Sequence, residues 1–380
     1  MKKLLEQYLK NLTDTSKCGA AQEESYYKHL DDLIKQYADK NIDVTILPKK
    51  TEAGNPDFRI WDGKNHITGY IEAKDPSVTN LDYIEGAEQL ERYLSTFPNV
   101  ILTNFFEFRL YRDGQRIAQA MINRPENIKE LFDLFFSFSL PKVQTALSLA
   151  IELAKRTRFL RDEVIAVEME EKGQIIDFYE AFKKYLIGNL TEKQFADFYA
   201  QIITYGLFAA RTRAPNDFNR KLAFDYIPHY ISLEEPPKSL QIIVDDIAEI
   251  LNVADANKIY QGRDPIIHFY ETFLTIYDPA IRKRRGVYYT PEAVVGYIVR
   301  SIHSILKTHF GLADGLASEQ VKLLDPAGGT LTFLAEAIRL AVDEFKNKYG
   351  VDGLHRWIKK HLLANFHAFE LMMAPYWQTK

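Results

Sequence analysis

The sequence predicts a multi-domain α/β protein, and three observations support this fold class. With 380 residues, the chain is long enough for about two or three domains. Residues 1–122 combine helical periodicity, strand-like alternation and a tight-turn signal, which predicts a mixed sheet flanked by helices. Residues 123–270 show helical periodicity throughout, whereas residues 271–380 contain a strand, a glycine turn and a helix in succession. We therefore expect an α/β sandwich, an all-helical connector and the beginning of a Rossmann-like domain.

The composition is that of an ordinary globular protein, with 46% hydrophobic and 26% charged residues. A net charge of −4 argues against nucleic acid bound over the whole surface but allows a local basic groove. Cys18 is the single cysteine, which excludes an intramolecular disulfide and fits a reducing compartment. No apolar run approaches the roughly 20 residues of a membrane span. The N-terminus, MKKLLEQYLKNL, lacks the apolar core of a signal peptide. These features predict a cytoplasmic protein without a membrane segment.

Residues 1–40 are predicted to be helical, because apolar side chains between residues 20 and 40 recur at steps of three and four. Glu23 and Glu24 lie in the first turn of this second helical stretch. They could add a third carboxylate to a metal site, or they could simply complement the helix dipole. A strand at residues 43–47 follows.

A β-hairpin is predicted at residues 55–74, NPDFRIWDGKNHITGYIEAK. Its first strand covers residues 57–61 and its second covers residues 66–73. The Asp62-Gly63 pair between them supplies the positive-φ positions that a tight hairpin turn needs. The hairpin is the part of the first domain that carries a candidate site.

Two carboxylates and an ammonium group converge on this hairpin. Alternation places Glu72 and Lys74 on one face of the second strand, and Asp57 begins the partner strand. Paired carboxylates can share a hard ion such as Mg²⁺, and a nearby lysine can orient a water for attack on a phosphodiester. The alternative is an exposed hairpin on which charges alternate without function. The pattern alone leaves both interpretations open.

A helix is expected at about residues 81–94, with Gln89 and Tyr93 four apart on one face. If that face packs beside the hairpin, Gln89 can bond a phosphate or a metal-bound water, with Tyr93 behind it. Otherwise Gln89 is a solvent residue and Tyr93 a core residue. The remaining strands of the sheet are predicted at residues 99–103, 105–111 and 115–121.

Residues 1–122 resemble the PD-(D/E)xK nuclease superfamily, and in particular the N-terminal nuclease of single-chain restriction–modification enzymes. Pro56-Asp57 matches the first half of the motif and Glu72-Ala73-Lys74 the second. Gln89 and Tyr93 match the Q-x-x-x-Y element of the RecB-like subgroup. The resemblance implies that Asp57 and Glu72 bind Mg²⁺, that Lys74 is catalytic and that Gln89 supports the reaction.

Residues 123–270 are interpreted as a helical connector without a catalytic cluster. No G-x-x-x-x-G-K-[ST] loop occurs in the chain, so we expect no ATP-driven motor. The segment also resembles the spacer between nuclease and methyltransferase in restriction enzymes, at FADFYAQIITYGLFAARTR and PIIHFYETFLTIYDPAIRKRRGVYYTP. Helices are predicted at residues 128–138, 143–160, 174–186, 191–211, 240–252 and 266–277.

The C-terminal region, residues 271–380, opens with a basic cluster at residues 282–285. This cluster is interpreted equally well as a phosphate contact or as a solvated turn. In the following GVYYTP, Thr290 is expected to be the N-cap of a helix and Pro291 its first helical residue.

A strand, a small-residue turn and a helix then follow, with the turn in DPAGGTLTFL at residues 325–334. This layout brings backbone close to a nucleotide-like ligand at the carboxyl end of a parallel sheet. A second strand at residues 366–369 ends in Glu370, an acidic residue that suits a ribose diol. The glycine pair taken alone would be only a tight turn.

This region resembles the N6-adenine DNA methyltransferases of type I and type IIG restriction systems. GVYYTP resembles their motif X, DPAGGTLTFL their motif I and Phe369-Glu370 their motif II. The resemblance implies an S-adenosyl-L-methionine site. Its expected residues are Tyr288, Thr290, Pro291, Asp325, Ala327, Gly329 and Glu370. Leu331 departs from the family pattern, because it stands where a second glycine is usual.

The family's catalytic N-P-P-Y does not occur in the sequence, and no target-recognition domain is recognised. We therefore expect an N-terminal fragment of a fused restriction–modification enzyme that acts on double-stranded DNA. It would consist of a nuclease (1–122), a connector (123–270) and the first part of an adenine DNA methyltransferase (271–380). Two alternatives remain open: a catalytically silent DNA-binding scaffold, and a modification-only assembly that needs a second polypeptide.

Overall fold

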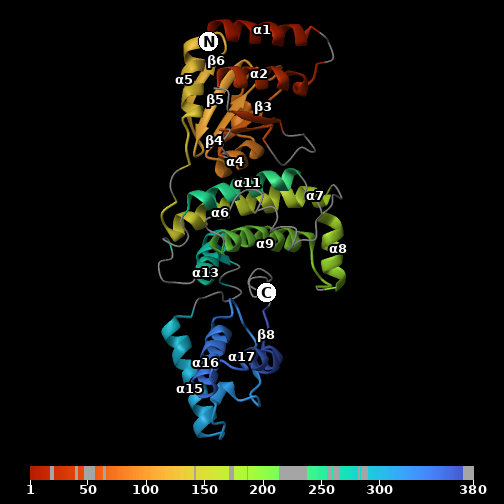
Figure 1. The fold of residues 1–380 in the computed structure, drawn as a ribbon. Helices are drawn as coiled ribbons and strands as arrows, with labels where there is room; N and C mark the ends of the chain where they lie inside the picture. The colour runs from red at the N-terminus through yellow and green to blue at the C-terminus, as the bar shows by residue number, and fades with distance from the viewer. Residues whose placement is uncertain are drawn as a thin grey trace. The chain divides into compact units, whose positions relative to one another are not determined.

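The chain folds into two compact units, Met1–Asp255 and Ala256–Lys380, which are described separately (Figure 1). The computed structural model describes residues 1–17, 21–38, 42–46, 56–62, 66–140, 143–170, 175–185, 187–213, 238–254, 259, 265–280, 283 and 290–370. Within these ranges, no helix is both long and apolar enough to cross a membrane.

A six-stranded mixed sheet forms the centre of the first unit. The strands are β1 (Asp43–Ile46), β2 (Phe58–Trp61), β3 (Ile67–Ala73), β4 (Asn99–Thr103), β5 (Glu107–Arg112) and β6 (Gln115–Met121), and they lie in this order. Neighbours are antiparallel except β3 and β4, which pair in parallel. The parallel pair requires a crossover, and α4 (Glu88–Thr96) lies within the connection between these two strands.

Helices cover both faces of this sheet, as the sequence predicts for a sandwich. One face packs against α1 (Lys2–Ser16), α2 (Tyr27–Tyr37) and α5 (Pro125–Phe136). Its core includes Phe58 and Ile71, which are at most 1% exposed. The other face carries a smaller apolar cluster in which Leu90 of α4 packs with Leu102 and Tyr111. The mixed α/β architecture predicted for this region is therefore observed.

Two predicted helices are interrupted. The stretch 1–40 contains α1, a short 3₁₀ turn at Glu23–Tyr26 and α2. The helix expected at residues 81–94 is divided into α3 (Asp82–Glu85) and α4, with Gly86 as the C-cap of α3. Glycine is a poor helix former, and its position explains the break.

The described part of the connector within the first unit is helical. Besides α5, which packs on the sheet, it comprises α6 (Ala146–Phe159), a π-helical turn at Leu160–Ile165, α7 (Ala166–Glu170), α8 (Ile175–Tyr185), α9 (Glu192–Arg213) and α11 (Lys238–Val253). The π-helical turn was not predicted, because its sequence has the same periodicity as the α-helices on either side. Such turns insert one extra residue into a helix and often lie near functional sites.

The second unit contains a short parallel sheet of β7 (Leu323–Asp325) and β8 (Phe366–Ala368). Its main helices are α13 (Pro265–Tyr277), α15 (Glu292–Thr308) and α16 (Thr332–Tyr349), and α17 (Leu354–Trp357) and α18 (Leu363–Asn365) precede β8. The order β7–α16–β8 agrees with the strand, turn and helix predicted for this region.

Candidate active site

The antiparallel register of the hairpin brings Asp57 and Glu72 together. Phe58 pairs with Ile71, so Asp57, one residue earlier, stands opposite Glu72, one residue later. The amide of Ala73 donates a hydrogen bond of 2.7 Å to Asp57 Oδ2, which holds the carboxylate against β3. Both acidic residues are only 2% exposed. Two buried carboxylates therefore lie side by side at the end of β3.

Lys74 lies beside the two carboxylates, as the sequence predicts. Its Nζ lies 2.6 Å from Glu72 Oε1, and its side chain is 20% exposed. The Lys74 amide donates to the carbonyl of Thr103 at 2.8 Å, which extends the pairing of β3 with β4 by one residue. The ammonium group is thus held at the rim of a buried site, where it partly balances the two negative charges.

Gln89 and Tyr93 on α4 face the same carboxylates. Gln89 Nε2 donates to the Tyr93 hydroxyl at 2.9 Å. Burial raises the pKa of the Tyr93 hydroxyl well above its usual range, and the nearby charges of Glu72 and Asp57 raise it further. Tyr93 thus lies within electrostatic range of the two hairpin carboxylates, and Gln89 is bonded to it. The expected five residues are therefore brought together, while their chemical roles remain predictions.

Tyr27, the first residue of α2, contacts the site and was not predicted from the sequence. Its hydroxyl donates to Asp57 Oδ1 in a very short hydrogen bond. The same hydroxyl lies 2.8 Å from Glu23 Oε1. Burial and the charge of Asp57 raise the pKa of Tyr27 far above its usual range, so the hydroxyl stays a donor. No short-range pattern in the sequence links these positions, because Tyr27 and Asp57 are separated by a strand.

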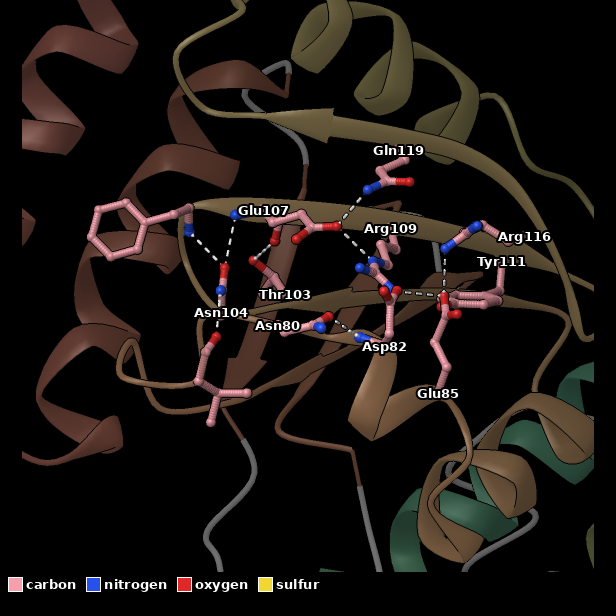
Figure 2. A network of polar contacts seen from close by, with 12 residues as sticks. Asn80, Asp82, Glu85, Thr103, Asn104, Glu107, Arg109, Tyr111, Arg116 and Gln119 are labelled. Carbon is pink, nitrogen blue, oxygen red and sulfur yellow. Dashed lines mark hydrogen bonds and ion pairs between the residues drawn. The ribbon is translucent and has the colours of Figure 1, made fainter.

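A polar network centred on the buried Arg109 holds the segment between Lys74 and α4 (Figure 2). At its centre, Arg109 contacts Glu107 at 2.6 Å, Asp82 at 2.7 Å and Glu85 at 3.0 Å. Asn104 Nδ2 donates to the carbonyl of Val78 at 2.7 Å. The network ties the connection that follows Lys74 to β5.

An ionic seam joins the connector helix α11 to the strands that carry the carboxylates. Asp245 pairs with Arg59 of β2 at 2.9 Å. Asp246 accepts from the Tyr70 hydroxyl at 3.2 Å and forms a very short ion pair with Arg156 of α6. The connector is therefore packed directly on β2 and β3.

Glu249 extends this seam, since its Oε2 accepts from the amide of Ile67 at 2.8 Å. Burial raises the pKa of Glu249 to about 8. The carboxyl group is therefore largely protonated at neutral pH, which reduces the cost of burying it.

The donor set at the hairpin fits a hard divalent cation. Two adjacent carboxylates supply oxygen ligands of the kind that Mg²⁺ prefers, and Mg²⁺ commonly uses only one or two carboxylates while keeping several waters. Across the described ranges, no group of three or more histidine, cysteine or acidic residues is arranged to hold a metal. The fit therefore rests on Asp57 and Glu72 alone, and Glu23 contacts Tyr27 instead.

In the second unit, four residues expected at a cofactor site lie around one loop. Ala327 N donates to Asp325 Oδ1 at 3.1 Å, and Gly329 N donates to Glu370 Oε2 at 2.7 Å. Asp325 Oδ2 is buried and has no hydrogen-bond partner among the described residues, which leaves an acceptor for a ligand. Leu331 has φ +59°, a left-handed conformation that favours the glycine usual at this position.

The start of α15 differs from the prediction. Pro291 is the N-cap and Glu292 the first helical residue, whereas Thr290 makes no capping bond. Pro291 has ψ 136°, so its backbone is extended, and its carbonyl accepts from Val294 at 2.8 Å and Val295 at 3.1 Å. Tyr288, also expected at the cofactor site, lies outside the described residues. Of the basic cluster at 282–285, only Lys283 is described.

Comparison with known proteins identifies one family. Residues 261–366 match the model of the N-6 DNA Methylase family. The match covers less than half of the chain and lies within the second unit. No curated protein matches the chain.

Three solved structures of DNA complexes are similar to the chain. A DrdV–DNA complex is 23% identical, with a TM-score of 0.43, over 99% of this chain and 37% of that chain. A nuclease-deletion mutant of the Type ISP restriction–modification enzyme LlaGI, in complex with a DNA substrate mimic, is 18% identical, with a TM-score of 0.42. The match covers 67% of this chain and 20% of that chain. DNA-bound LlaBIII, an ATP-dependent Type ISP restriction–modification enzyme, is 18% identical, with a TM-score of 0.39. The match covers 67% of this chain and 18% of that chain. The chain thus spans about a third of the DrdV chain and a fifth of the others.

Proposed function

We propose that the chain is part of a restriction–modification enzyme that acts on double-stranded DNA. Its residues 1–122 would form a Mg²⁺-dependent endonuclease, residues 123–270 a helical connector, and residues 271–380 the first part of an N6-adenine DNA methyltransferase. The observation that carries the nuclease proposal is the convergence of Asp57, Glu72 and Lys74 at the end of β3. The methyltransferase proposal rests on the family match at residues 261–366.

In this proposal Asp57 and Glu72 hold the ion, and their burial keeps their oxygens ordered. Bound Mg²⁺ supplies polarisation of a phosphodiester oxygen and an acidified water. Lys74 orients the attacking water through its ammonium group, while its contact with Glu72 keeps that group in place. Gln89 extends the polar rim of the site and contacts the scissile phosphate or a water. Hydrolysis of this kind needs no ATP, and the chain carries no P-loop.

Nicking of supercoiled plasmid tests the nuclease. Wild-type chain, Lys74→Ala and Glu72→Gln are compared with Mg²⁺ and with chelator, and Glu91→Gln on the exposed side of α4 serves as the matched control. We expect wild type and Glu91→Gln to nick DNA only with Mg²⁺, and the two site variants to be inactive. Equal nicking by all four proteins would refute the site. Metal-independent DNA binding without nicking would favour a silent scaffold.

For the methyltransferase part, S-adenosyl-L-methionine is the implied methyl donor, and Asp325, Ala327, Gly329 and Glu370 would hold it. The buried Asp325 Oδ2, which has no hydrogen-bond partner among the described residues, and the Glu370 carboxylate bonded to the same loop supply polar groups suited to this ligand. Titration calorimetry with S-adenosyl-L-methionine tests this assignment. Binding that appears only after a polypeptide carrying N-P-P-Y is added would favour a modification assembly built from two chains.

A further inference from the structure

Tyr27 holds one of the two candidate metal-binding carboxylates from a part of the fold that the hairpin motif does not include. Its hydroxyl donates to Asp57 Oδ1, while the Ala73 amide donates to Oδ2 at 2.7 Å. Each oxygen of the carboxylate therefore receives a hydrogen bond from a different layer, one from α2 and one from β3. Two bonds on opposite oxygens fix the carboxylate plane, whereas one bond would leave it free to turn.

The tyrosine ring is itself held rigidly. It packs on Phe58, with ring centroids 4.9 Å apart, and on Phe105, at 6.4 Å. Phe105 has φ +72°, a left-handed conformation that is strained for a residue with a side chain. Thr103 Oγ1 accepts from the Phe105 amide at 2.9 Å, and the Tyr8 hydroxyl donates to the Phe105 carbonyl at 3.1 Å. Strain that the surroundings maintain in this way is typical of functional sites.

Glu23 shares the same hydroxyl. The Tyr27 oxygen carries one hydrogen, but it lies within hydrogen-bond distance of both Asp57 Oδ1 and Glu23 Oε1. The two acceptors compete for that hydrogen, and we assign it to Asp57, the acceptor that is buried at the candidate site. Glu23 therefore sits behind Tyr27, one step away from the candidate metal ligands.

We propose that Tyr27 is a positioning residue that orients the Asp57 carboxylate for a divalent metal ion. This inference rests on the proposed nuclease function. In this proposal α2 contributes to metal binding indirectly, through the hydroxyl of Tyr27, and does not supply a further carboxylate ligand. Removal of the hydroxyl should leave the ring packing intact and weaken only the hold on the metal.

Calorimetric titration with Mn²⁺ tests the proposal on the full chain. Tyr27→Phe should bind Mn²⁺ about tenfold more weakly than wild type, the effect expected for one charge-assisted hydrogen bond. Tyr37→Phe is the matched control, because Tyr37 lies on the same helix and donates to the carboxylate of Asp133 at 2.5 Å, away from the site. It should bind Mn²⁺ like wild type. Equal binding by Tyr27→Phe and wild type would overturn the proposal.

Glu23→Gln provides a second variant. Its amide can donate to the phenol oxygen and leave the Tyr27 hydrogen for Asp57, so Mn²⁺ binding should persist. A loss as large as that of Tyr27→Phe would overturn the proposal, because Glu23 would then be a ligand itself. Thermal melting without metal should give the same midpoint for Tyr27→Phe and Tyr37→Phe.

The metal dependence of nicking separates this inference from the proposed function. Tyr27→Phe should need about ten times more Mg²⁺ for half-maximal nicking and reach a similar rate at saturation. A chain whose Mn²⁺ affinity depends on Tyr27 and Asp57 but which never nicks DNA would refute hydrolysis and support the inference. Mn²⁺ binding that does not depend on Asp57 would overturn the inference itself.

Discussion

The ionic seam between α11 and the hairpin strands should make the stability of the first unit depend on pH through Glu249. This residue is 5% exposed, and burial raises its pKa from the usual 4.5 to about 8. Asp246 and Asp62 raise the pKa further, whereas the Ile67 amide and Arg156 lower it. Between pH 4.5 and 8 the folded chain therefore holds a proton that the unfolded chain has lost.

The sign of the effect follows from this difference in bound protons. Stability contributed by the protonated Glu249 is complete below the unfolded pKa and is lost as the pH rises toward the folded pKa. The free energy of unfolding should fall by up to about 1.4 kcal/mol per pH unit in that window, or a few kcal/mol in total. Glu249→Gln stays neutral and keeps an acceptor for Ile67, so its profile should lack this decrease.

Chemical denaturation at several pH values between 5 and 9 measures the difference between wild type and Glu249→Gln. Subtraction removes the contributions of other titrating groups that the two proteins share. The variant should match wild type near pH 5 and exceed its stability above pH 8. Glu130→Gln, on the exposed side of α5, is the control and should follow wild type. Parallel profiles for wild type and Glu249→Gln would refute the reasoning.

Other substitutions test packing, the ionic seam and the cofactor loop. Gly69→Ala should destabilise the chain by about 1–3 kcal/mol in urea denaturation, because its Cβ would lie 2.5 Å from the Asn99 carbonyl oxygen. Gly86→Ala, with nothing within 4 Å, should have little effect, and equal losses would contradict this account. Arg156→Met should cost about 3–5 kcal/mol, because it leaves the Asp246 charge buried without its ion pair; an unchanged denaturation midpoint would show that the pair is not needed. Glu370→Gln should weaken S-adenosyl-L-methionine binding in calorimetry, and unchanged affinity would remove Glu370 from the site.

Local patterns predicted the two paired strands of the hairpin well, whereas its predicted turn at residues 63–65 lies outside the described residues. The predicted bounds of β4 and β6 match the observed ones. The spacing of Gln89 and Tyr93 correctly placed both on one face of α4, since four residues make about one helical turn. The predicted proximity of Asp57, Glu72 and Lys74 followed from the expected pairing of the two hairpin strands and the alternation of side chains along them.

Tertiary contacts were beyond this kind of reasoning. Tyr27 reaches Asp57 across 30 positions, and Asp245 reaches Arg59 across 186. Neither spacing matches a helical or strand period, so only the folded chain brings them together. The Pro291 cap was missed because threonine is a common N-cap and proline a common first helical residue, so Thr290-Pro291 favours a helix that starts one residue earlier.

The most direct test of the central claim is the position of a bound divalent ion in a crystal of the chain grown with Mn²⁺. Anomalous scattering should place Mn²⁺ within about 2.0–2.2 Å of oxygens from both Asp57 and Glu72, at distances close to those of Mg²⁺. Such a peak, absent from Asp57→Asn crystals, would support a metal-dependent nuclease built on this hairpin. A peak bound elsewhere, or none at saturating Mn²⁺, would contradict it.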